Sequence, residues 1–456
     1  MCRLKQRCVF IIKSFPICMP TIFDAFYITA LAFGLPYFLL KIVINKRFRA
    51  GLLHRFGFIP AKTGKKPCIW IHCASVGEVL TAKPLIKSIE KEFDGFEIAL
   101  SVNTNTGFSV AKKYFEGKRI FYFPLDVSWV VDKAFNRIKP QFILLIELEI
   151  WPNFITAAAK KQIPVVLVNA RISDKSAKWY RLFCRISGTF LKSLLRKENL
   201  FCARTQADAF RLKELGISET QITVTGNMKY DNIVTGIPAN TRERLLKLFE
   251  IEADEKVIVC GSTFEGEEII LLRVFKNLCV KFGKLRLIIA PRHIERVSDI
   301  IKQIASLGLG YAKKSSLDKG KKGAGYKGNP IIVVDTVGEL STIYSIADCV
   351  FVGRSLIPHG GQNMVEPAGL AKPVIVGPHT FNFKEEVDLL KEADAILIVK
   401  DEHSLSKAIT YLLEHPEESG EIGRRAQLAV TKQMGVVNRN MHILREHFLE
   451  ERTVLL

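Results

Sequence analysis

Short runs of β-branched and aliphatic residues alternate with amphipathic stretches from residue 67 to near the end of the chain. Each run is long enough for one strand, and most intervening stretches have apolar residues at helical spacing. The first series of runs covers residues 68–74, 97–103, 120–123, 142–149, 165–170 and 222–225. The second series covers residues 257–261, 285–290, 331–335, 349–352, 374–376 and 395–399. This alternation predicts two α/β domains with mainly parallel sheets, which bind ligands at the carboxyl ends of their strands.

A polar stretch with a glycine and a proline, IVTGIPAN at residues 233–240, separates the two series and is typical of a linker. We therefore expect an N-terminal domain over residues 51–236 and a C-terminal domain over 237–456, facing each other across a cleft. Residues 1–50 hold a basic N-terminus and an apolar segment.

The apolar segment at residues 23–44 is just long enough for a helix that crosses a membrane, which needs about 20 residues. Residues 41–66 carry lysines and arginines but no acid, so the positive-inside rule places the remaining chain in the cytoplasm. A cleaved signal peptide fits poorly, because such peptides seldom have so basic a far flank. A helix that lies in the membrane surface without crossing it is an open alternative.

The composition narrows the choice of partners. The 456 residues include 66 lysines and arginines against 46 acids, a formal charge of +20. That excess favours an anionic partner, which can be nucleic acid, a phosphorylated small molecule or an anionic membrane face. The ten cysteines have no metal-binding spacing and suit a reducing cytosol. The mean hydropathy of +0.15 is high for a soluble protein and agrees with a membrane-embedded segment.

The strand ends of the first domain carry acidic and basic residues that could take part in catalysis. The stretch IWIHCASVGEV runs from a strand through small residues to Glu78, which lies at a helix start where a carboxylate also complements the helix dipole. Glu147 and Glu149 close a later strand, either as functional acids or as the cap of the next helix. Lys229 follows near the linker, in GNMKYD.

The strand ends of the second domain are polar and rich in glycine. GSTFEGEE contains a possible capping box between Ser262 and Glu265, and the same helix start could instead hold an anion. Arg292, in PRH, can grip a phosphate. HGGQNMVEP places two glycines, whose N–H groups suit a phosphate, before Glu366, whose carboxylate could accept two ribose hydroxyls.

Nine motifs resemble, in order, those of the lipopolysaccharide 3-deoxy-D-manno-octulosonic acid (Kdo) transferases: HCASVGE, ELEIWPN, NARIS, GNMKYD, GSTFEGEE, PRH, DTVGEL, HGGQNMVEPAG and GPHTFNF. The resemblance implies the GT-B glycosyltransferase fold, with two facing Rossmann-like domains and an N-terminal membrane-anchor helix. It also implies CMP-Kdo as donor, a lipid A precursor (lipid IVA) as acceptor, and an inverting transfer in lipopolysaccharide biosynthesis. We expect no cofactor or bound metal, and a location at the cytoplasmic face of the inner membrane.

The resemblance also implies roles for individual residues. Glu78 is then the general base, ionised at neutral pH, that takes the proton from the acceptor hydroxyl. Glu149 orients the acceptor or the base, and Lys229 and Arg292 stabilise charge on the departing CMP. The residues expected around CMP are Pro291, Arg292, Val337, Gly338, Glu339, Asn363, Met364, Val365 and Glu366. Gln362 stands where the family usually has a histidine.

Two further segments fit more than one interpretation or have no assigned function. The aromatic and basic residues of 177–197 suit a membrane interface, or a surface helix that buries its aromatic side chains. The stretch DKGKKGAGYKG at residues 318–328 predicts a flexible basic surface loop.

Three other functions agree with parts of the pattern. Another membrane-associated GT-B transferase with a different nucleotide-sugar donor would share the two glycines and Glu366. It would not be expected to combine PRH with GSTFEGEE and HCASVGE. A nucleic-acid-binding protein would use the +20 charge, but the sequence has no recognised motif of that class. A membrane-tethered scaffold would have no need to keep Arg292 and the acids at the strand ends.

Overall fold

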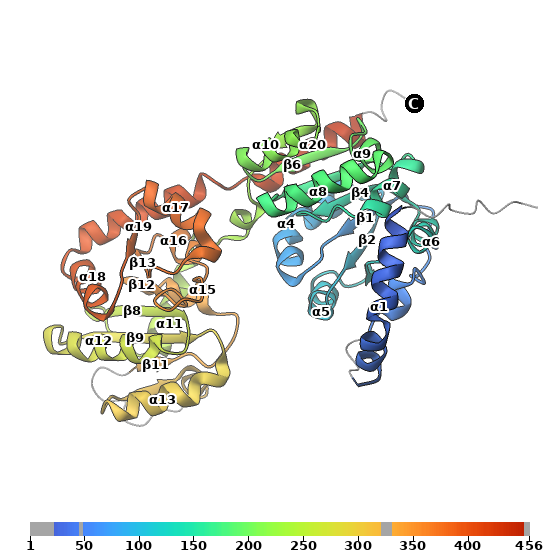
Figure 1. Cartoon of the computed structure of the whole chain (residues 1–456). Helices are drawn as coiled ribbons and strands as arrows, with labels where there is room; N and C mark the ends of the chain where they lie inside the picture. Colours follow the sequence, from blue (N-terminus) through green and yellow to red (C-terminus); the bar gives the residue numbers. More distant parts are fainter. Residues whose placement is uncertain (1–21, 45–48, 321–330, 451–456) are drawn as a thin grey trace, which may run out of the picture. The chain divides into compact units, whose positions relative to one another are not determined.

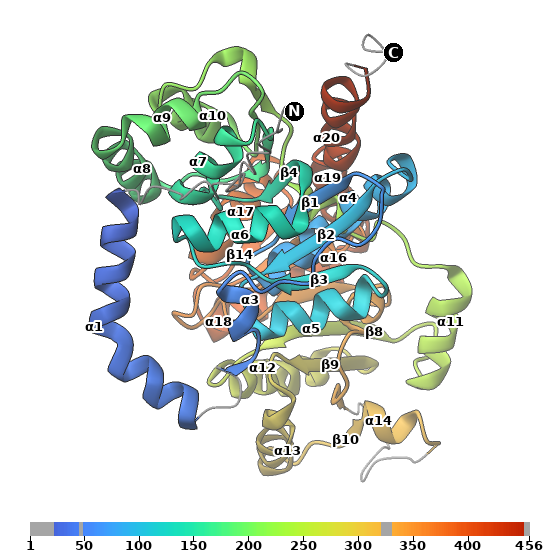
Figure 2. The same cartoon turned by 90° about the vertical axis from the view of Figure 1, so that its right-hand side faces the viewer.

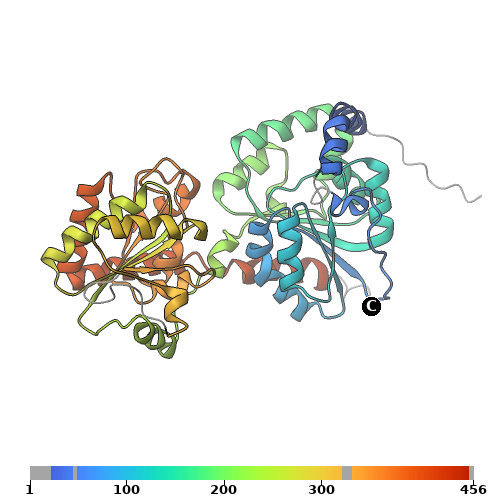
Figure 3. The ribbon, with the colours of Figure 1, turned by 90° about the horizontal axis from the view of Figure 1, so that it is seen from below.

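Two compact units make up the structure, a computed structural model that describes residues 22–44, 49–320 and 331–450. The first unit runs to Met228 and includes the chain again from Gly435, and the second unit is Lys229–Met434 (Figure 1). Each unit is a parallel β-sheet with helices on both faces (Figure 3). The two predicted parallel-sheet α/β domains are therefore confirmed, and they are consistent with the GT-B fold.

Seven parallel strands form the sheet of the first unit, in the order β3-β2-β1-β4-β5-β6-β7. They are β1 (Cys68–His72), β2 (Glu97–Val102), β3 (Arg119–Tyr122), β4 (Pro140–Ile146), β5 (Val165–Ala170), β6 (Leu200–Ala203) and β7 (Ile222–Val224). All five residues of β1 are buried, as expected for a central strand covered on both faces. The carboxyl end of β1 lies between β2 and β4, where His72 pairs with Ser101 and Leu145.

Helices cover both faces of this sheet because alternate strand residues point to opposite sides. Trp70 packs on one side with Phe135 and Phe154, whose ring centroids lie 5.4 and 5.0 Å away. Ile69 belongs to the apolar cluster on the other side. The helices are α1 (Ile22–Ile44), α3 (Leu52–Arg55), α4 (Val76–Glu92), α5 (Asn105–Tyr114), α6 (Ser128–Ile138), α7 (Pro152–Lys160), α8 (Asp174–Ile186), α9 (Gly188–Leu194), α10 (Gln206–Glu214) and α20 (Val436–Arg445).

The second sheet is also parallel, in the order β10-β11-β9-β8-β12-β13-β14. Its strands are β8 (Lys256–Thr263), β9 (Leu285–Pro291), β10 (Tyr311–Lys313), β11 (Ile331–Val333), β12 (Cys349–Val352), β13 (Val374–Val376) and β14 (Ile396–Ile398). Its helices are α11 (Ala239–Leu248), α12 (Glu267–Lys281), α13 (Val297–Ser306), α14 (Lys314–Leu317), α15 (Leu340–Tyr344), α16 (Val365–Gly369), α17 (Lys384–Glu392), α18 (Glu402–Glu414) and α19 (Pro416–Thr431).

The C-terminal helix α20 belongs to the first unit, whereas the sequence pattern assigned all of residues 237–456 to the second domain. Val436 and Met441 are buried in the apolar cluster of the first sheet that also contains α4 residues. Beyond α20, Phe448 stacks on Phe142 of β4, with ring centroids 3.9 Å apart. The apolar face of α20 therefore finds its partner in the first unit, and a strand-by-strand count along the chain has no signal for such a return.

Helix α1 occupies the segment for which the sequence predicts a membrane anchor. The start of α1 lies beside α8 (Figure 2). The ring of Phe23, in its first turn, lies 5.7 Å from Phe183 of α8 and 5.9 Å from Phe190 of α9. Within the described ranges, we find no helix both long enough and apolar enough to cross a membrane. The basic residues 1–21 and most of the basic loop predicted over 318–328 lie outside the described residues.

Candidate active site

Glu78 lies in the first turn of α4, just after the carboxyl end of β1. The Ser75 hydroxyl caps α4 by accepting from the Glu78 N–H at 3.4 Å. The Glu78 carboxylate accepts from the Ala74 N–H at 2.5 Å and from the Ser75 hydroxyl at 3.1 Å. Glu78 therefore does contribute to the helix start, and the same contacts hold its carboxylate at the sheet edge where ligands of parallel sheets bind.

The Glu78 carboxyl group holds its proton more tightly than an ordinary glutamate. The residue is only 8% exposed, and this burial raises its pKa to about 8. Hydrogen bonds from Ala74 and Ser75 oppose the shift, and the charges of Glu147 and Glu149 add to it. Burial therefore opposes the ionised state that the sequence analysis expected for Glu78 at neutral pH. A pKa near 8 still suits a group that exchanges a proton with a substrate.

Glu149 and His72 form a polar cluster in the same unit. The Glu149 carboxylate accepts from the Trp151 indole N–H at 2.8 Å and lies 3.5 Å from Nε2 of His72. The other ring nitrogen of His72 lies 2.9 Å from the Ser101 hydroxyl, and its ring stacks on Phe123 with 4.0 Å between centroids. His72 is fully buried, so these contacts fix the position of the imidazole ring beside Glu149. In the sequence, His72 is marked only as a polar residue that closes an apolar run.

Glu147 and Glu149 lie beyond β4, not inside the buried strand where the sequence placed them. The strand ends one residue before Glu147, where the chain turns with φ +63°. The acid that caps α7 is Asp126, which accepts from the N–H groups of Asn153 at 3.0 Å and Phe154 at 2.8 Å. The interpretation of Glu147 or Glu149 as the cap is therefore wrong, and both acids remain available for chemistry.

Three predicted residues of the second unit line one pocket of about 120 Å³: Lys229, Asn363 and Glu366. Glu366 lies in the first turn of α16, and its carboxylate accepts from the Ser341 hydroxyl at 2.8 Å and from the Asn363 amide at 2.9 Å. Lys229 belongs to a short 3-10 helix, Met228–Asn232. Residues from separate motifs are thus brought together, and Ser341, which the sequence did not single out, joins them.

Arg292, Val337, Gly338 and Glu339 lie at other strand ends of the second sheet. Arg292 is exposed and directly follows β9, and Val337 is 80% exposed. Gly338 has φ +91°, a conformation that favours glycine. The Glu339 carboxylate accepts from Nζ of Lys314 at 2.6 Å. Burial alone would raise the pKa of Glu339, but hydrogen bonds from Lys314 and a neighbouring hydroxyl lower it below its ordinary value.

The remaining predicted nucleotide-binding residues have buried side chains. Pro291 ends β9 in a fully buried strand, and Met364 and Val365 belong to the apolar core of the second sheet. Met364 has no exposed surface. These three residues can therefore offer a ligand their backbone atoms, while their side chains set the position of the strand end and of α16.

Of the two glycines before Glu366, Gly361 has its N–H group engaged within the protein. The N–H of Gly361 donates to the Arg354 carbonyl at 2.7 Å. A Cβ atom on Gly360 would lie 2.2 Å from the Asn382 side chain. Positive φ angles and close packing therefore account for this glycine pair, and the Gly361 amide is engaged within the protein.

GSTFEGEE is organised around Glu267. Helix α12 begins after a glycine N-cap, Gly266, in place of the capping box expected between Ser262 and Glu265. The buried Glu267 carboxylate accepts from the Phe264 N–H at 3.1 Å and from three N–H groups of the loop at residues 354–356, at 2.7, 2.9 and 2.9 Å. The protein's own carboxylate thus takes the hydrogen bonds of this loop.

Residues 177–197 form α8 and α9 and divide their large side chains between core and solvent. Phe190 is fully buried. Trp179 is 54% exposed on α8, and Leu182 and Ile186 are exposed beside it. The burial of Phe190 agrees with a surface helix that buries aromatic side chains, and the membrane interface stays a prediction for the exposed side chains.

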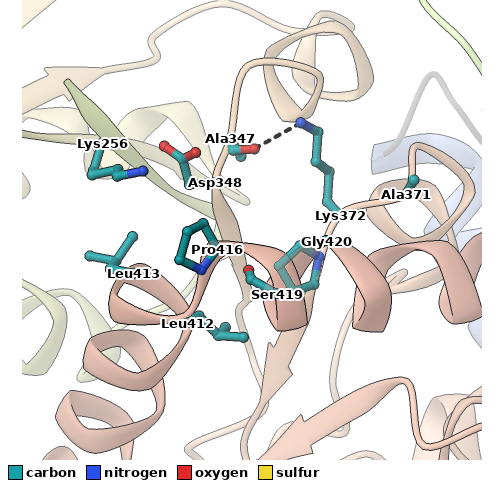
Figure 4. A pocket seen from close by; sticks show the side chains of 11 residues that line it. Lys256, Ala347, Asp348, Ala371, Lys372, Leu412, Leu413, Pro416, Ser419 and Gly420 are labelled. Atoms are coloured by element: carbon teal, nitrogen blue, oxygen red, sulfur yellow. Dashed lines mark hydrogen bonds between the residues drawn. The ribbon is translucent and has the colours of Figure 1, made fainter. Parts of the chain in front are cut away.

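A different pocket of the second unit, of about 160 Å³, lies at the opposite edge of the sheet, where β8 and β12 begin (Figure 4). Lys256 and Asp348 line it, and Nζ of Lys372 donates to the Ala347 carbonyl at 2.8 Å. Its lining contains none of the residues that the sequence analysis singled out. The carboxyl edge of each sheet therefore remains a candidate site.

Comparison with known proteins shows the family to which the chain belongs. The sequence model described as 3-Deoxy-D-manno-octulosonic-acid transferase (kdotransferase) matches residues 50–232. A similar relative is 3-deoxy-D-manno-octulosonic acid transferase of Haemophilus influenzae, 31% identical over 421 residues, with 90% of this chain and 94% of the relative covered. The protein of the same description from Chlamydophila psittaci is 29% identical over 402 residues, covering 87% of this chain and 89% of that relative.

The solved structures add evidence on the fold. A crystal structure described as a glycosyltransferase from Rickettsia africae covers 85% of this chain and 100% of its own, with a TM-score of 0.54. At 14% identity this likeness shows a shared fold alone. The relative from Haemophilus influenzae is similar over nearly its whole length, and that similarity shows the family. The chain belongs to the 3-deoxy-D-manno-octulosonic acid transferases, a family of glycosyltransferases.

Proposed function

We propose that the protein transfers Kdo from CMP-Kdo to the lipid A precursor lipid IVA, with inversion at the anomeric carbon. The observation that carries this proposal is the buried Glu78 carboxyl group, held at the carboxyl edge of the first sheet with a pKa of about 8. Membership of the Kdo transferase family supports the identity of the sugar.

In the proposed reaction, the ionised form of Glu78 takes the proton from an acceptor hydroxyl as the hydroxyl oxygen attacks the anomeric carbon of Kdo. The bond from that carbon to the CMP phosphate oxygen breaks, and its electron pair leaves with CMP. Glu149, which Trp151 holds 3.5 Å from His72, keeps negative charge near Glu78 and so raises its proton affinity. In this proposal Glu149 also orients the acceptor.

The second unit supplies the proposed donor site. Lys229 and Arg292 would balance the charge that develops on the CMP phosphate, an effect often worth about 3–4 kcal/mol per donor. Glu366 would accept ribose hydroxyls, since its two contacts, with Ser341 and Asn363, leave other lone pairs on the carboxylate. The other residues proposed around CMP are Pro291, Val337, Gly338, Glu339, Met364 and Val365.

We further propose that the reaction takes place at the cytoplasmic face of the inner membrane, where the N-terminal segment anchors the protein. The support is the +20 charge together with exposed apolar side chains on two helices. Phe26 and Phe33 of α1 are 67% and 85% exposed, and Trp179 of α8 is 54% exposed. Such side chains beside basic residues suit a surface of anionic lipid.

The test is to incubate the purified protein with CMP-Kdo and lipid IVA and to detect the product by mass spectrometry. Product should form, with release of CMP, and should still form in the presence of EDTA. Replacement of Glu78 by glutamine should reduce its rate sharply. Turnover of a UDP-sugar without turnover of CMP-Kdo would instead support the transferase with a different donor.

A further inference from the structure

An apolar pocket lies at the carboxyl edge of the first sheet, between α1 and the loops that follow β2, β3 and β4. Its volume is about 330 Å³, within the range of small-ligand pockets, about 300–1,000 Å³. Most of its surface is apolar, and its walls include Tyr27 and Ala30 of α1 together with Phe123, Leu125, Val127 and Trp151. The walls therefore suit a hydrocarbon ligand.

The polar groups of this pocket are mostly engaged within the protein. Asp126 accepts from the two N–H groups that begin α7 and from the Tyr27 hydroxyl. Arg55, a partly buried cation in the lining, donates from Nη2 to the Asn103 carbonyl at 2.5 Å. A guanidinium group has five N–H donors, so Arg55 can also bind an anionic group. The pocket thus combines apolar walls with a single fixed cation among the residues that line it.

Two hydrogen bonds connect the pocket to Glu78. The wall residue Asn103 donates its backbone N–H to the Ala74 carbonyl at 3.0 Å, and the Ala74 N–H donates to the Glu78 carboxylate at 2.5 Å. A second wall residue, Trp151, donates to Glu149. The apolar pocket and the candidate base therefore belong to one continuous edge of the first sheet.

We propose that this pocket binds one acyl chain of the lipid acceptor, with Arg55 contacting an anionic group near the polar end of that lipid. This inference rests on the proposed function. An acylated acceptor carries its reacting hydroxyl and its chains in one molecule, so it can occupy the base and the adjoining pocket together. A sugar nucleotide would leave these apolar walls in contact with its polar groups, which is unfavourable. Helix α1, which forms one wall, also exposes Phe26, Ile28 and Phe33.

The experiment compares two acceptors, lipid IVA and the same bisphosphorylated disaccharide without its acyl chains, with CMP-Kdo as donor. The wild type should use lipid IVA with the higher kcat/KM. Ala30→Trp fills the pocket from α1, and Leu125→Trp fills it from the opposite loop, so each should lower the preference for lipid IVA on the order of tenfold. The loss should appear mainly as a higher KM for lipid IVA.

Ala25→Trp is the matched control, because Ala25 is exposed on α1 and is not part of the pocket lining. This variant should keep the wild-type preference for lipid IVA. An unchanged preference in both pocket variants, or an equal change in the control, would overturn the acyl-chain site while leaving the proposed function intact. If the wild type used neither acceptor, the proposed function itself would fail, and the acyl-chain site with it.

Discussion

Glu78 carries the proposed proton transfer, and Glu78→Gln removes the base while keeping the size of the side chain. The single carbonyl oxygen of a glutamine can still accept from the Ala74 N–H, and its NH₂ group can donate to the Ser75 hydroxyl, but it cannot take a proton from the acceptor. We expect kcat to fall by about 10²–10⁴-fold. The affinity for CMP should stay unchanged, because the residues proposed around CMP belong to the second unit. Initial rates by mass spectrometry and CMP titration by calorimetry measure the two effects.

Glu90→Gln is the control for this change. Glu90 lies on the same helix, α4, and pairs with Lys118 at 3.0 Å. Glu90→Gln therefore makes the same chemical change on this helix but away from the candidate site. Its rate should remain within about twofold of the wild type, as expected for a surface ion pair. Equal losses in the two variants would contradict the role of Glu78.

The pKa of Glu78 predicts how the rate depends on pH. A base with a pKa of about 8 is mostly protonated, and therefore inactive, at lower pH. We expect kcat/KM to rise about tenfold per pH unit below pH 8 and to level off above it. A profile that is already flat between about pH 6 and 9 would contradict this assignment.

Glu149→Gln gives a second test of the same electrostatics. The negative charge of Glu149 is one of the causes that raise the pKa of Glu78, so its removal lowers that pKa. The rise of kcat/KM should therefore move to lower pH, whatever the loss in maximal rate. No shift would show that the two carboxyl groups do not interact, and a shift to higher pH would contradict the sign of their interaction.

At the scale of elements, Asp126 holds α7 in position. Each oxygen of its carboxylate accepts from one N–H group at the helix start, those of Asn153 and Phe154. In Asp126→Asn, one oxygen becomes an NH₂ group that faces a backbone donor, so we expect a loss of about 1–2 kcal/mol in the free energy of unfolding. Urea unfolding measures this, with the exposed Asp94→Asn as a control expected to change little.

The strands that the sequence pattern identifies are those with a clear apolar run. The two that it misses, β6 (Leu200–Ala203) and β10 (Tyr311–Lys313), are only four and three residues long. Strand β10 is also an edge strand with mixed polarity, so its pairing partner and not its own sequence determines it. Short elements of this kind depend on tertiary contacts that no local pattern records.

The candidate site residues show the same limit of local sequence patterns. Motifs at strand ends pointed to Glu78 in the first sheet and to Asn363 and Glu366 in the second, because a parallel sheet brings its own strand ends to one edge. Contacts between distant segments were not predictable, such as Glu267 with the loop at 354–356 or Asp126 with the start of α7. Burial was equally hidden, and it is burial that gives Glu78 its raised pKa.

At the scale of the whole molecule, the C-terminal end of the chain belongs to the first unit. The chain passes through the entire second unit, Lys229–Met434, and returns to the first unit from Gly435 onward. The first unit, which contains Glu78, therefore depends on the C-terminal helix α20 for part of its apolar core. Changes near the end of the chain should affect the proposed acceptor side rather than the donor side.

Met441→Asp tests this dependence. Met441 of α20 is 1% exposed in the cluster that contains α4, so a charge there is unfavourable and should loosen α4. We expect hydrogen–deuterium exchange of the α4 amides to become faster by about tenfold or more, while α12 of the second unit exchanges as before. Leu428→Asp is the control, because Leu428 is 56% exposed on α19 and should change neither helix. Faster exchange in α12 with α4 unaffected would mean that α20 stabilises the second unit instead.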